Sequence, residues 1–344
     1  MRLNLSLRPL ALLAGLVLAA CTSTAPKPTD KPDIRTEVPP VTAAATTAPS
    51  TAAPIKIGLA LGGGAAKGFA HIGVIKMLEA NGLVPAVVAG TSAGSVVGAL
   101  YASGMHPFEL QEKAVALDEA RIRDLQLSSG GLVLGQKLED YVNEQVRRRP
   151  LEQLPKPFVA VATRLEDGER TVFGRGNTGQ AVRASSSIPG VFQPVKIGKF
   201  HFVDGGVVSP VPVDAARELG ADLVVAVDIS SKPRGKTPTD LLGTMGQAID
   251  IMGQKLSQAE LARADVVIHP KVLDVGPADF GQRTNAILEG EKAALAALPK
   301  IRQRIAQLQA DRARAVQQAC LENRSRLQKL AGAAGLDEAC GAVK

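Results

Sequence analysis

Along most of the chain, short and almost continuously apolar runs alternate with stretches in which apolar residues recur at helical spacing. The first two runs, residues 55–61 and 84–89, are each followed by a glycine-rich turn and then by a helical pattern. Later runs that predict strands cover residues 158–163, 171–173, 201–203, 223–228 and 266–269. Continuous apolar runs are typical of strands that are buried on both faces of a sheet. The pattern therefore predicts a mostly parallel sheet.

Helices fill the intervals between these runs. The clearest helical patterns cover residues 69–80, 94–103, 213–219 and 241–263. Because strands and helices alternate, we expect an α/β fold of three layers, with helices on both faces of the sheet. Residues 55–215 would form the core of this domain, and residues 216–299 would form the C-terminal part of the same domain.

The N-terminus has a different pattern. A basic start around Arg2 and Arg8 precedes eleven apolar residues that end at Cys21. At about 1.5 Å per residue this run is too short to cross a hydrocarbon core of about 30 Å, so residues 1–20 predict a signal peptide. The last four residues of this region, Leu-Ala-Ala-Cys, resemble the lipobox of bacterial lipoproteins. That resemblance implies cleavage before Cys21 and lipidation of Cys21; the alternative is an ordinary signal peptide with an incidental cysteine.

Residues 21–54 are rich in Thr, Ala, Pro and Lys and hold almost no large apolar residues. Such a segment cannot bury enough surface to offset the entropy of ordering, so we expect an extended, disordered tether. The tether either holds the folded domain near a bilayer or is a passive spacer.

The C-terminal tail, residues 300–344, carries most of the formal net charge of +7. Between residues 300 and 330, eight basic residues face two acidic ones, and apolar residues recur near helical spacing. This pattern predicts a basic amphipathic helix, which either lies on anionic lipid or packs on the domain. Cys320 and Cys340 would form one disulfide only if they lie close together in an oxidising compartment.

The segment Gly90-Thr91-Ser92-Ala93-Gly94 fits the pattern G-x-S-x-G between a predicted strand and a predicted helix. In that context the pattern indicates a nucleophile elbow, a tight turn that exposes the serine hydroxyl. Gly90 and Gly94 lack the Cβ atoms that would clash there. The helix that follows Ser92 directs its positive dipole toward a developing oxyanion. Ser92 is therefore the candidate catalytic nucleophile.

A second glycine-rich turn, Gly62-Gly63-Gly64-Ala65-Ala66-Lys67-Gly68, also joins a strand to a helix. It fits a nucleotide-binding loop poorly, because position 67 is lysine and residues 80–90 hold no carboxylate. The backbone N–H groups of Gly63 and Gly64 favour an oxyanion hole instead. The alternative is a tight turn that merely uses glycine.

A serine nucleophile needs a proton acceptor, and Asp204 is the candidate because it ends a predicted strand just before Gly205 and Gly206. The chain has four histidines, and none follows Ser92 in the order and spacing of an α/β-hydrolase triad. His201 lies three residues before Asp204 on the same strand, so its side chain should point to the opposite face.

Together, the glycine loop with Lys67, the elbow and the aspartate followed by two glycines resemble, in that order, the patatin-like phospholipase family. The segment at residues 184–194 is also similar to the stretch that precedes the aspartate of that family. The resemblance covers residues 55–215 approximately, and it implies a Ser–Asp dyad without a catalytic histidine.

Carried onto this chain, the resemblance implies that Ser92 is the nucleophile and Asp204 its partner. The oxyanion hole would be formed by the amides of Gly63, Gly64 and Ala65. The chain departs from the family at Ala65, where the family usually has a third glycine. A methyl group there would tighten the site.

We therefore expect a serine acyl hydrolase of the phospholipase A or lysophospholipase type that cleaves carboxylic esters of lipids without a cofactor or a metal. Membrane lipids would be its substrate and its surface, and the lipobox places it in the bacterial envelope, at the outer membrane and facing the periplasm or the cell surface. Nucleotide binding is not expected, and the scarcity of aromatic residues and the export signal disfavour nucleic acid. The alternative is a non-catalytic lipid-binding or scaffolding lipoprotein of the same fold.

Overall fold

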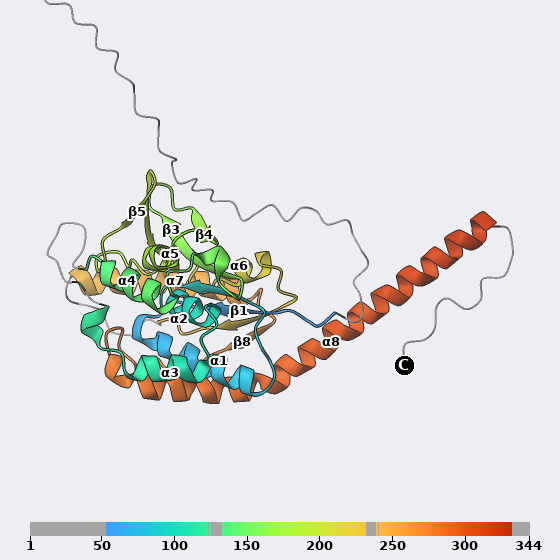
Figure 1. Cartoon of the computed structure of the whole chain (residues 1–344), viewed down its shortest axis with the longest axis horizontal. Helices are drawn as coiled ribbons and strands as arrows, with labels where there is room; N and C mark the ends of the chain where they lie inside the picture. The colour runs from blue at the N-terminus through green and yellow to red at the C-terminus, as the bar shows by residue number, and fades with distance from the viewer. Residues whose placement is uncertain (1–52, 123, 125–132, 232–238, 240, 332–344) are drawn as a thin grey trace, which may run out of the picture. The chain divides into compact units, whose positions relative to one another are not determined.

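The computed structural model of the chain describes residues 53–331 except for residues 123, 125–132, 232–238 and 240 (Figure 1). The predicted signal peptide, Cys21, the tether and Cys340 lie outside the described residues. In the part that is described, no helix combines the length and the apolarity that crossing a membrane requires.

The sheet has eight strands in the order β5-β6-β3-β2-β1-β7-β8, and β4 pairs with β3 away from this path. The strands are β1 (Ile57–Leu61), β2 (Val87–Thr91), β3 (Phe158–Arg164), β4 (Arg170–Phe173), β5 (Val195–Ile197), β6 (Phe200–Asp204), β7 (Leu223–Val227) and β8 (Val266–Ile268). The five strands from β3 to β8 along this order are parallel, whereas β4, β5 and β6 pair antiparallel. The prediction of a mostly parallel sheet is confirmed.

Two strands differ from the sequence-based expectation. The second strand starts at Val87 rather than at Val84, because Pro85 has no N–H to donate to a ladder and Val84 is left exposed. The short strand β5 was not expected from the apolar pattern. It pairs only with β6, at the edge of the sheet. Its three residues are not all buried, so they form no continuous apolar run in the sequence.

Eight α-helices surround the sheet in the described residues (Figure 1). They are α1 (Phe69–Ala80), α2 (Ala93–Ala102), α3 (Pro107–Val115), α4 (Gln136–Gln145), α5 (Thr178–Ser185), α6 (Val213–Glu218), α7 (Leu241–Leu261) and α8 (Arg283–Ala331). Successive residues of β1 face different layers: Leu59 and Leu61 pack with α1 and α2, whereas Ala60 packs with α6. The three-layer α/β sandwich is therefore confirmed.

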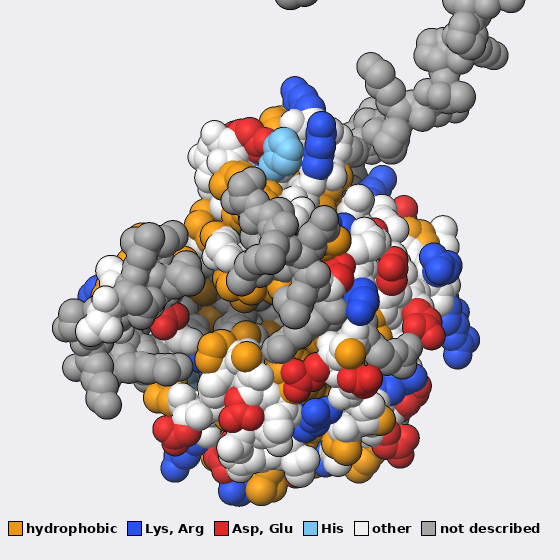
Figure 2. Space-filling view, turned by 90° about the vertical axis from the view of Figure 1, so that its left-hand side faces the viewer, with side chains coloured by type: hydrophobic (Ala, Val, Ile, Leu, Met, Phe, Trp, Pro, Cys, Tyr) orange, Lys and Arg blue, Asp and Glu red, His pale blue; other side chains and the backbone are white. Residues whose placement is uncertain are grey.

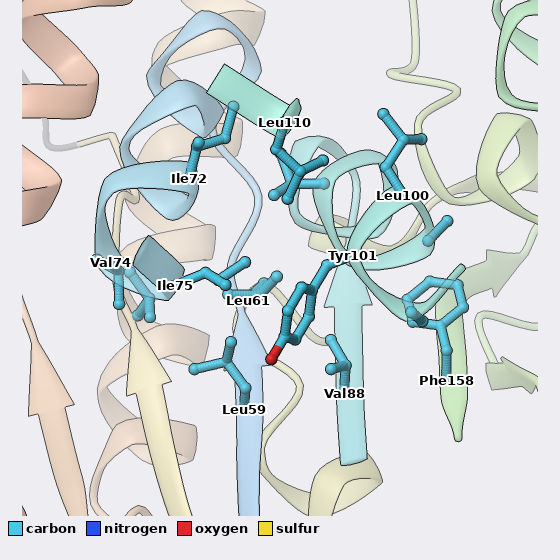
Figure 3. Packing of buried hydrophobic residues seen from close by; sticks show 14 of the residues in the cluster. Leu59, Leu61, Ile72, Val74, Ile75, Val88, Leu100, Tyr101, Leu110 and Phe158 are labelled. Carbon is cyan, nitrogen blue, oxygen red and sulfur yellow. The ribbon is translucent and has the colours of Figure 1, made fainter. Parts of the chain in front are cut away.

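The larger of the two apolar layers includes Tyr101 of α2. Figure 3 shows its ring over β1 and β2, beside Leu61 and Val88. The Tyr101 hydroxyl donates a hydrogen bond to Glu79 at 2.5 Å, which joins α2 to the end of α1. Each fully buried Leu or Val of this layer contributes about 1.5–3 kcal/mol to folding. The layer thereby fixes the two helices that follow the glycine-rich turns.

Helix α8 packs closely against α1 through two glycines. A Cβ atom on Gly73 of α1 would lie 2.0 Å from the carbonyl oxygen of Ile287, and one on Gly290 would lie 2.0 Å from that of Ala70. The two backbones approach this closely only because neither glycine carries a side chain. The crossing holds α1, the helix that follows the glycine loop, at a fixed place in the fold.

The basic tail belongs to this same helix, which begins at Arg283 and runs through Pro299. Arg304 pairs with Asp265 at 3.0 Å, and Arg312 forms an ion pair with Asp222. The first part of the tail therefore packs on the domain, which is one of the two alternatives that its sequence left open. Further along α8, Cys320 is disulfide-bonded.

Candidate active site

Strand β3 brings the two candidate catalytic residues together. On one side it pairs with β2, where Thr91 lies opposite Val161. On the other side it pairs with β6, where Asp204 lies opposite Ala162. Ser92 follows directly after Thr91, so two residues that are 112 positions apart in the chain lie on the two sides of β3.

Ser92 sits in the strained turn that its sequence predicts. Its backbone has φ 53° and ψ −124°, between the end of β2 and the start of α2. A Cβ atom on Gly90 would lie 2.5 Å from the carbonyl oxygen of Gly94, and one on Gly94 would lie 2.1 Å from that of Leu61. Neither flanking position has room for a side chain, so glycine is required at both. The turn stores strain of about 1–3 kcal/mol. This geometry is that of a nucleophile elbow.

Asp204 is a buried carboxylate at the end of β6. Its Oδ1 accepts a hydrogen bond from the N–H of Gly206 at 2.7 Å, whereas Oδ2 is buried and has no completed hydrogen bond within the described residues. Burial raises the pKa of Asp204 to about 6, and the nearby hydroxyl of Ser92 and the N–H of Gly206 limit that rise. Catalytic hydrogen bonds commonly tighten only when substrate binds. Oδ2 is thus an acceptor that remains available.

Position 205 also has no room for a side chain, because a Cβ atom on Gly205 would lie 2.2 Å from the carbonyl oxygen of Val161. The backbone just after Asp204 therefore packs directly against the backbone of β3.

The glycine loop lies against the nucleophile, since a Cβ atom on Gly63 would be 3.2 Å from the Cβ of Ser92. The N–H of Gly63, however, donates to the carbonyl oxygen of Pro210 at 2.9 Å. The N–H groups of Gly64 and Ala65 form no hydrogen bond with any described residue. The N–H of Gly63 is thus engaged within the fold, whereas the next two amides have no partner among the described residues.

Residues 59–217 match the family model described as patatin-like phospholipase. The chain belongs to the patatin-like phospholipase family. An uncharacterised NTE family protein of Mycobacterium tuberculosis is 38% identical over 183 residues, which are 52% of this chain and 51% of that protein. A second NTE family protein of the same organism is 30% identical over 275 residues, 70% of this chain and 46% of that protein. The chain spans about half the length of these relatives.

The lysophospholipase NTE1 of Pyricularia oryzae is 26% identical over 280 residues, which are 72% of this chain and 18% of that protein. Among solved structures, VipD from Legionella pneumophila has a TM-score of 0.51 at 16% identity, and the match covers 72% of this chain and 67% of VipD. This likeness supports the patatin-like fold of the described residues.

Within this patatin-like domain, Ala65 adopts the left-handed conformation that the usual family glycine would adopt freely, with φ 52°. For a residue with a side chain this conformation costs about 1–2 kcal/mol. The methyl group predicted to tighten the site is thus tolerated at the cost of backbone strain.

Two buried side chains, those of Lys67 and His71, form hydrogen bonds at the glycine loop. The buried Lys67 donates a hydrogen bond to the hydroxyl of Ser231 at 2.6 Å. His71 is fully buried and donates from Nε2 to the carbonyl oxygen of Gly62 at 2.8 Å. Burial lowers the pKa of His71 to about 4, so this ring is neutral at pH 7 and acts as a hydrogen-bond donor to the loop. Gly68 lets Ala93 approach, because its Cβ atom would lie 2.6 Å from that of Ala93.

Each of the other three histidines is engaged away from the dyad. His106 accepts from the N–H of Phe108 at the start of α3, His201 contacts Glu166 at 2.9 Å and His269 contacts Asp228 at 3.2 Å. Among the described residues, no histidine is a hydrogen-bond partner of the dyad.

Two contacts that motif reading missed hold the dyad in place. The hydroxyl of Ser185, at the end of α5, accepts a hydrogen bond from the N–H of Ser92 at 2.9 Å and donates to the carbonyl oxygen of Val161 at 2.5 Å. Two residues later, the carbonyl oxygen of Ser187 accepts from the N–H of Asp204 at 2.9 Å. The only signal in the sequence was the resemblance of residues 184–194 to the family.

Hydrophobic side chains surround a hollow on the face shown in Figure 2. Near the dyad in the sequence, Val191 and Val207 expose apolar side chains to 44% and 40%. A separate cavity of about 440 Å³ lies between α3 and α4, and its lining includes none of the dyad or glycine-loop residues. No group of side chains suited to binding a metal ion occurs among the described residues.

Proposed function

We propose that this chain is a serine acyl hydrolase that cleaves carboxylic esters of lipids, of the phospholipase A or lysophospholipase type, through Ser92 and Asp204. The observation that carries the proposal is a serine in a strained turn beside a buried carboxylate that keeps one oxygen available. This is the arrangement that an activated serine nucleophile requires.

In the first step, Oδ2 of Asp204 accepts the proton of the Ser92 hydroxyl while Oγ attacks the ester carbonyl carbon. A carboxylate with a pKa of about 6 is ionised at pH 7 and is a stronger base than an ordinary aspartate. The proton then passes to the alcohol that leaves. Water adds to the acyl-enzyme in the same way, releasing the fatty acid and restoring the Ser92 hydroxyl.

The negative charge that develops on the carbonyl oxygen is met by the N–H groups of Gly64 and Ala65 and by the N-terminus of α2. Removing one such donor typically costs about 10²–10³-fold in rate. The hydrogen bond from Gly63 to Pro210 fixes the loop that presents these two amides.

A lipid ester is the substrate class that fits best. The family and the lysophospholipase named among the relatives support it, and so do the exposed apolar side chains of Val191 and Val207. These side chains suit acyl chains better than polar substrates.

The decisive experiment uses a fluorophosphonate probe, p-nitrophenyl esters and phospholipid vesicles. We expect wild-type protein to bind the probe and release fatty acid, and both activities to disappear in Ser92→Ala. Ser103→Ala, a serine at the end of the same helix, is the matched control. A wild-type protein that binds vesicles but neither labels nor turns over would favour a non-catalytic lipid-binding protein instead.

We further propose that the protein is a lipoprotein of the bacterial envelope, anchored through Cys21. The signal-peptide pattern and the resemblance to a lipobox support this, and a disulfide at Cys320 suits an oxidising compartment. Metabolic labelling with a palmitate analogue should mark the wild type in the membrane fraction. Cys21→Ala should lose the label, and retention of label in that variant would contradict the anchor.

A further inference from the structure

The segment from Asp204 to Val211 connects all parts of the proposed site, and the inference drawn from it rests on the proposed function. Its first residue is the proposed base. The carbonyl oxygen of Ser209 accepts a hydrogen bond from the Thr91 hydroxyl at 2.8 Å, directly before the nucleophile. The carbonyl oxygen of Pro210 accepts from the N–H of Gly63 in the glycine loop. Any shift of this segment would therefore move the elbow and the oxyanion donors together.

The side chain of Glu260, on α7, also holds this segment, and it does so through two hydrogen bonds. Its Oε2 accepts a hydrogen bond from the N–H of Val211 at 2.8 Å, and its Oε1 accepts from the hydroxyl of Ser209. Glu260 is only 6% exposed and Ser209 only 1%. A buried carboxylate is costly unless its oxygens are hydrogen-bonded, and here both oxygens are used on one short segment.

We propose that Glu260 is a positioning residue, which clamps residues 209–211 and thereby sets the glycine loop and the nucleophile elbow relative to each other. It lies beyond residues 59–217, the part that matches the family model, so the family motifs do not assign it a role. It touches neither the dyad nor the oxyanion donors and acts through the backbone of Ser209, Pro210 and Val211.

The charges around Glu260 come from two helices. Arg263 of α7 and Asp214 of α6 form an ion pair with each other at 2.7 Å, and their effects on Glu260 oppose one another. Burial raises the pKa of Glu260 to about 7, and the hydrogen bonds from Ser209 and Val211 limit that rise. Loss of the proton near neutral pH strengthens Glu260 as an acceptor, so the clamp should tighten as pH rises through 7.

The first test is amide hydrogen exchange on the full chain. In Glu260→Ala the N–H of Gly63 should exchange about tenfold faster than in wild type, because its acceptor Pro210 is no longer fixed. Gln258→Ala, an exposed position on the same helix, is the control and should leave this exchange unchanged. Equal exchange in the two variants would overturn the proposal, whether or not the wild-type protein is a hydrolase.

The second test separates positioning from a loss of folded protein. Per probe-titrated active site, kcat for a p-nitrophenyl ester should fall about 10- to 100-fold in Glu260→Ala with little change in KM, as expected for misplaced catalytic groups. Glu260→Gln keeps the size and an acceptor for Val211, so it should restore most of kcat. It should also remove one protonation step from the acid side of the pH–rate profile.

These measurements distinguish the two ideas. A wild-type protein without turnover removes the proposed function, while the exchange of Gly63 still decides the role of Glu260. If Glu260→Ala does not fold, Glu260→Gln carries the test, and a pH–rate profile unchanged from that of the wild type would overturn the proposal.

Discussion

The hydroxyl of Ser185, at the end of α5, joins the turn after β2 to β3, because it accepts a hydrogen bond from the backbone N–H of Ser92 at 2.9 Å and donates to the carbonyl oxygen of Val161. In Ser185→Ala that buried N–H loses its acceptor, which costs about 1–3 kcal/mol of unfolding free energy. We expect chemical denaturation to show this loss and kcat to fall with it. Ser103→Ala, whose hydroxyl bonds only within its own helix, should show neither effect. A wild-type kcat in Ser185→Ala would contradict a role in holding the elbow.

The raised pKa of Asp204 predicts how activity depends on pH. The proposed base must be ionised, so kcat/KM should decline below pH 6, by up to tenfold for each pH unit. The profile of a soluble ester measures this directly. A flat profile between pH 7 and pH 5 would exclude Asp204 as the base.

The same shift predicts that the proposed base destabilises the fold. The pKa of Asp204 is about 6 in the folded protein, compared with 3.8 for an unperturbed aspartate, so the wild type loses stability as pH rises from about 4 through 6. Asp204→Asn should therefore be inactive and, above pH 7, more stable by about 2–3 kcal/mol.

This gain in Asp204→Asn should vanish below pH 4, where aspartate is protonated in both states. Ser92→Ala is the control: it is equally inactive but keeps the carboxyl group, so it should not show the pH-dependent gain. Denaturant melts of the three proteins at pH 4 and pH 8 test both statements. Equal stability of Asp204→Asn and wild type at pH 8 would contradict them.

The positive φ of Ala65 predicts an unusual response to substitution. Ala65→Gly relieves strain and adds unfolded-state entropy, so the net change in stability should lie within about 1 kcal/mol, with full activity. Ala65→Val places a β-branched side chain in the left-handed region and should lose both stability and rate.

Ala66→Gly is the matched control for this position, because Ala66 has no positive φ and should lose about 0.5–1 kcal/mol. Denaturant melts and esterase assays compare the variants. A large destabilisation by Ala65→Gly would show that the left-handed turn is not strained.

A glycine-to-alanine change should have opposite effects at the crossing of α1 and α8 and at an open position on α7. Gly290→Ala would place a Cβ atom 2.0 Å from the carbonyl oxygen of Ala70, so it should destabilise the protein by about 1–3 kcal/mol or more. Gly253→Ala on α7 has nothing within 4 Å of the new Cβ and should stabilise by about 0.5–1 kcal/mol. Thermal melts of both variants check the sign of each effect.

The sequence was enough to predict the three-layer sheet, the elbow at Ser92 and the carboxylate at Asp204, because each rests on a local pattern. Apolar runs mark buried strands, and the glycines beside Ser92 and Asp204 mark backbone that has no room for a side chain.

What could not be predicted depends on contacts between distant positions. Nothing in the sequence near Gly63 indicates that its N–H donates to the carbonyl oxygen of Pro210, 147 positions away. Ser185 and Glu260 likewise act on partners 93 and 49 or 51 residues away. Buried polar residues of this kind read as ordinary helix residues until their partners are known.

The pairing of β1 with β7 has a practical consequence for dissecting the protein. The segment that matches the family ends at residue 217, before β7, yet Gly62 at the end of β1 donates its N–H to Val227 of β7 at 3.1 Å. A fragment cut at the family boundary would leave β1 as an open edge beside the glycine loop. Chimeras and minimal catalytic fragments should therefore extend through the first turns of α8.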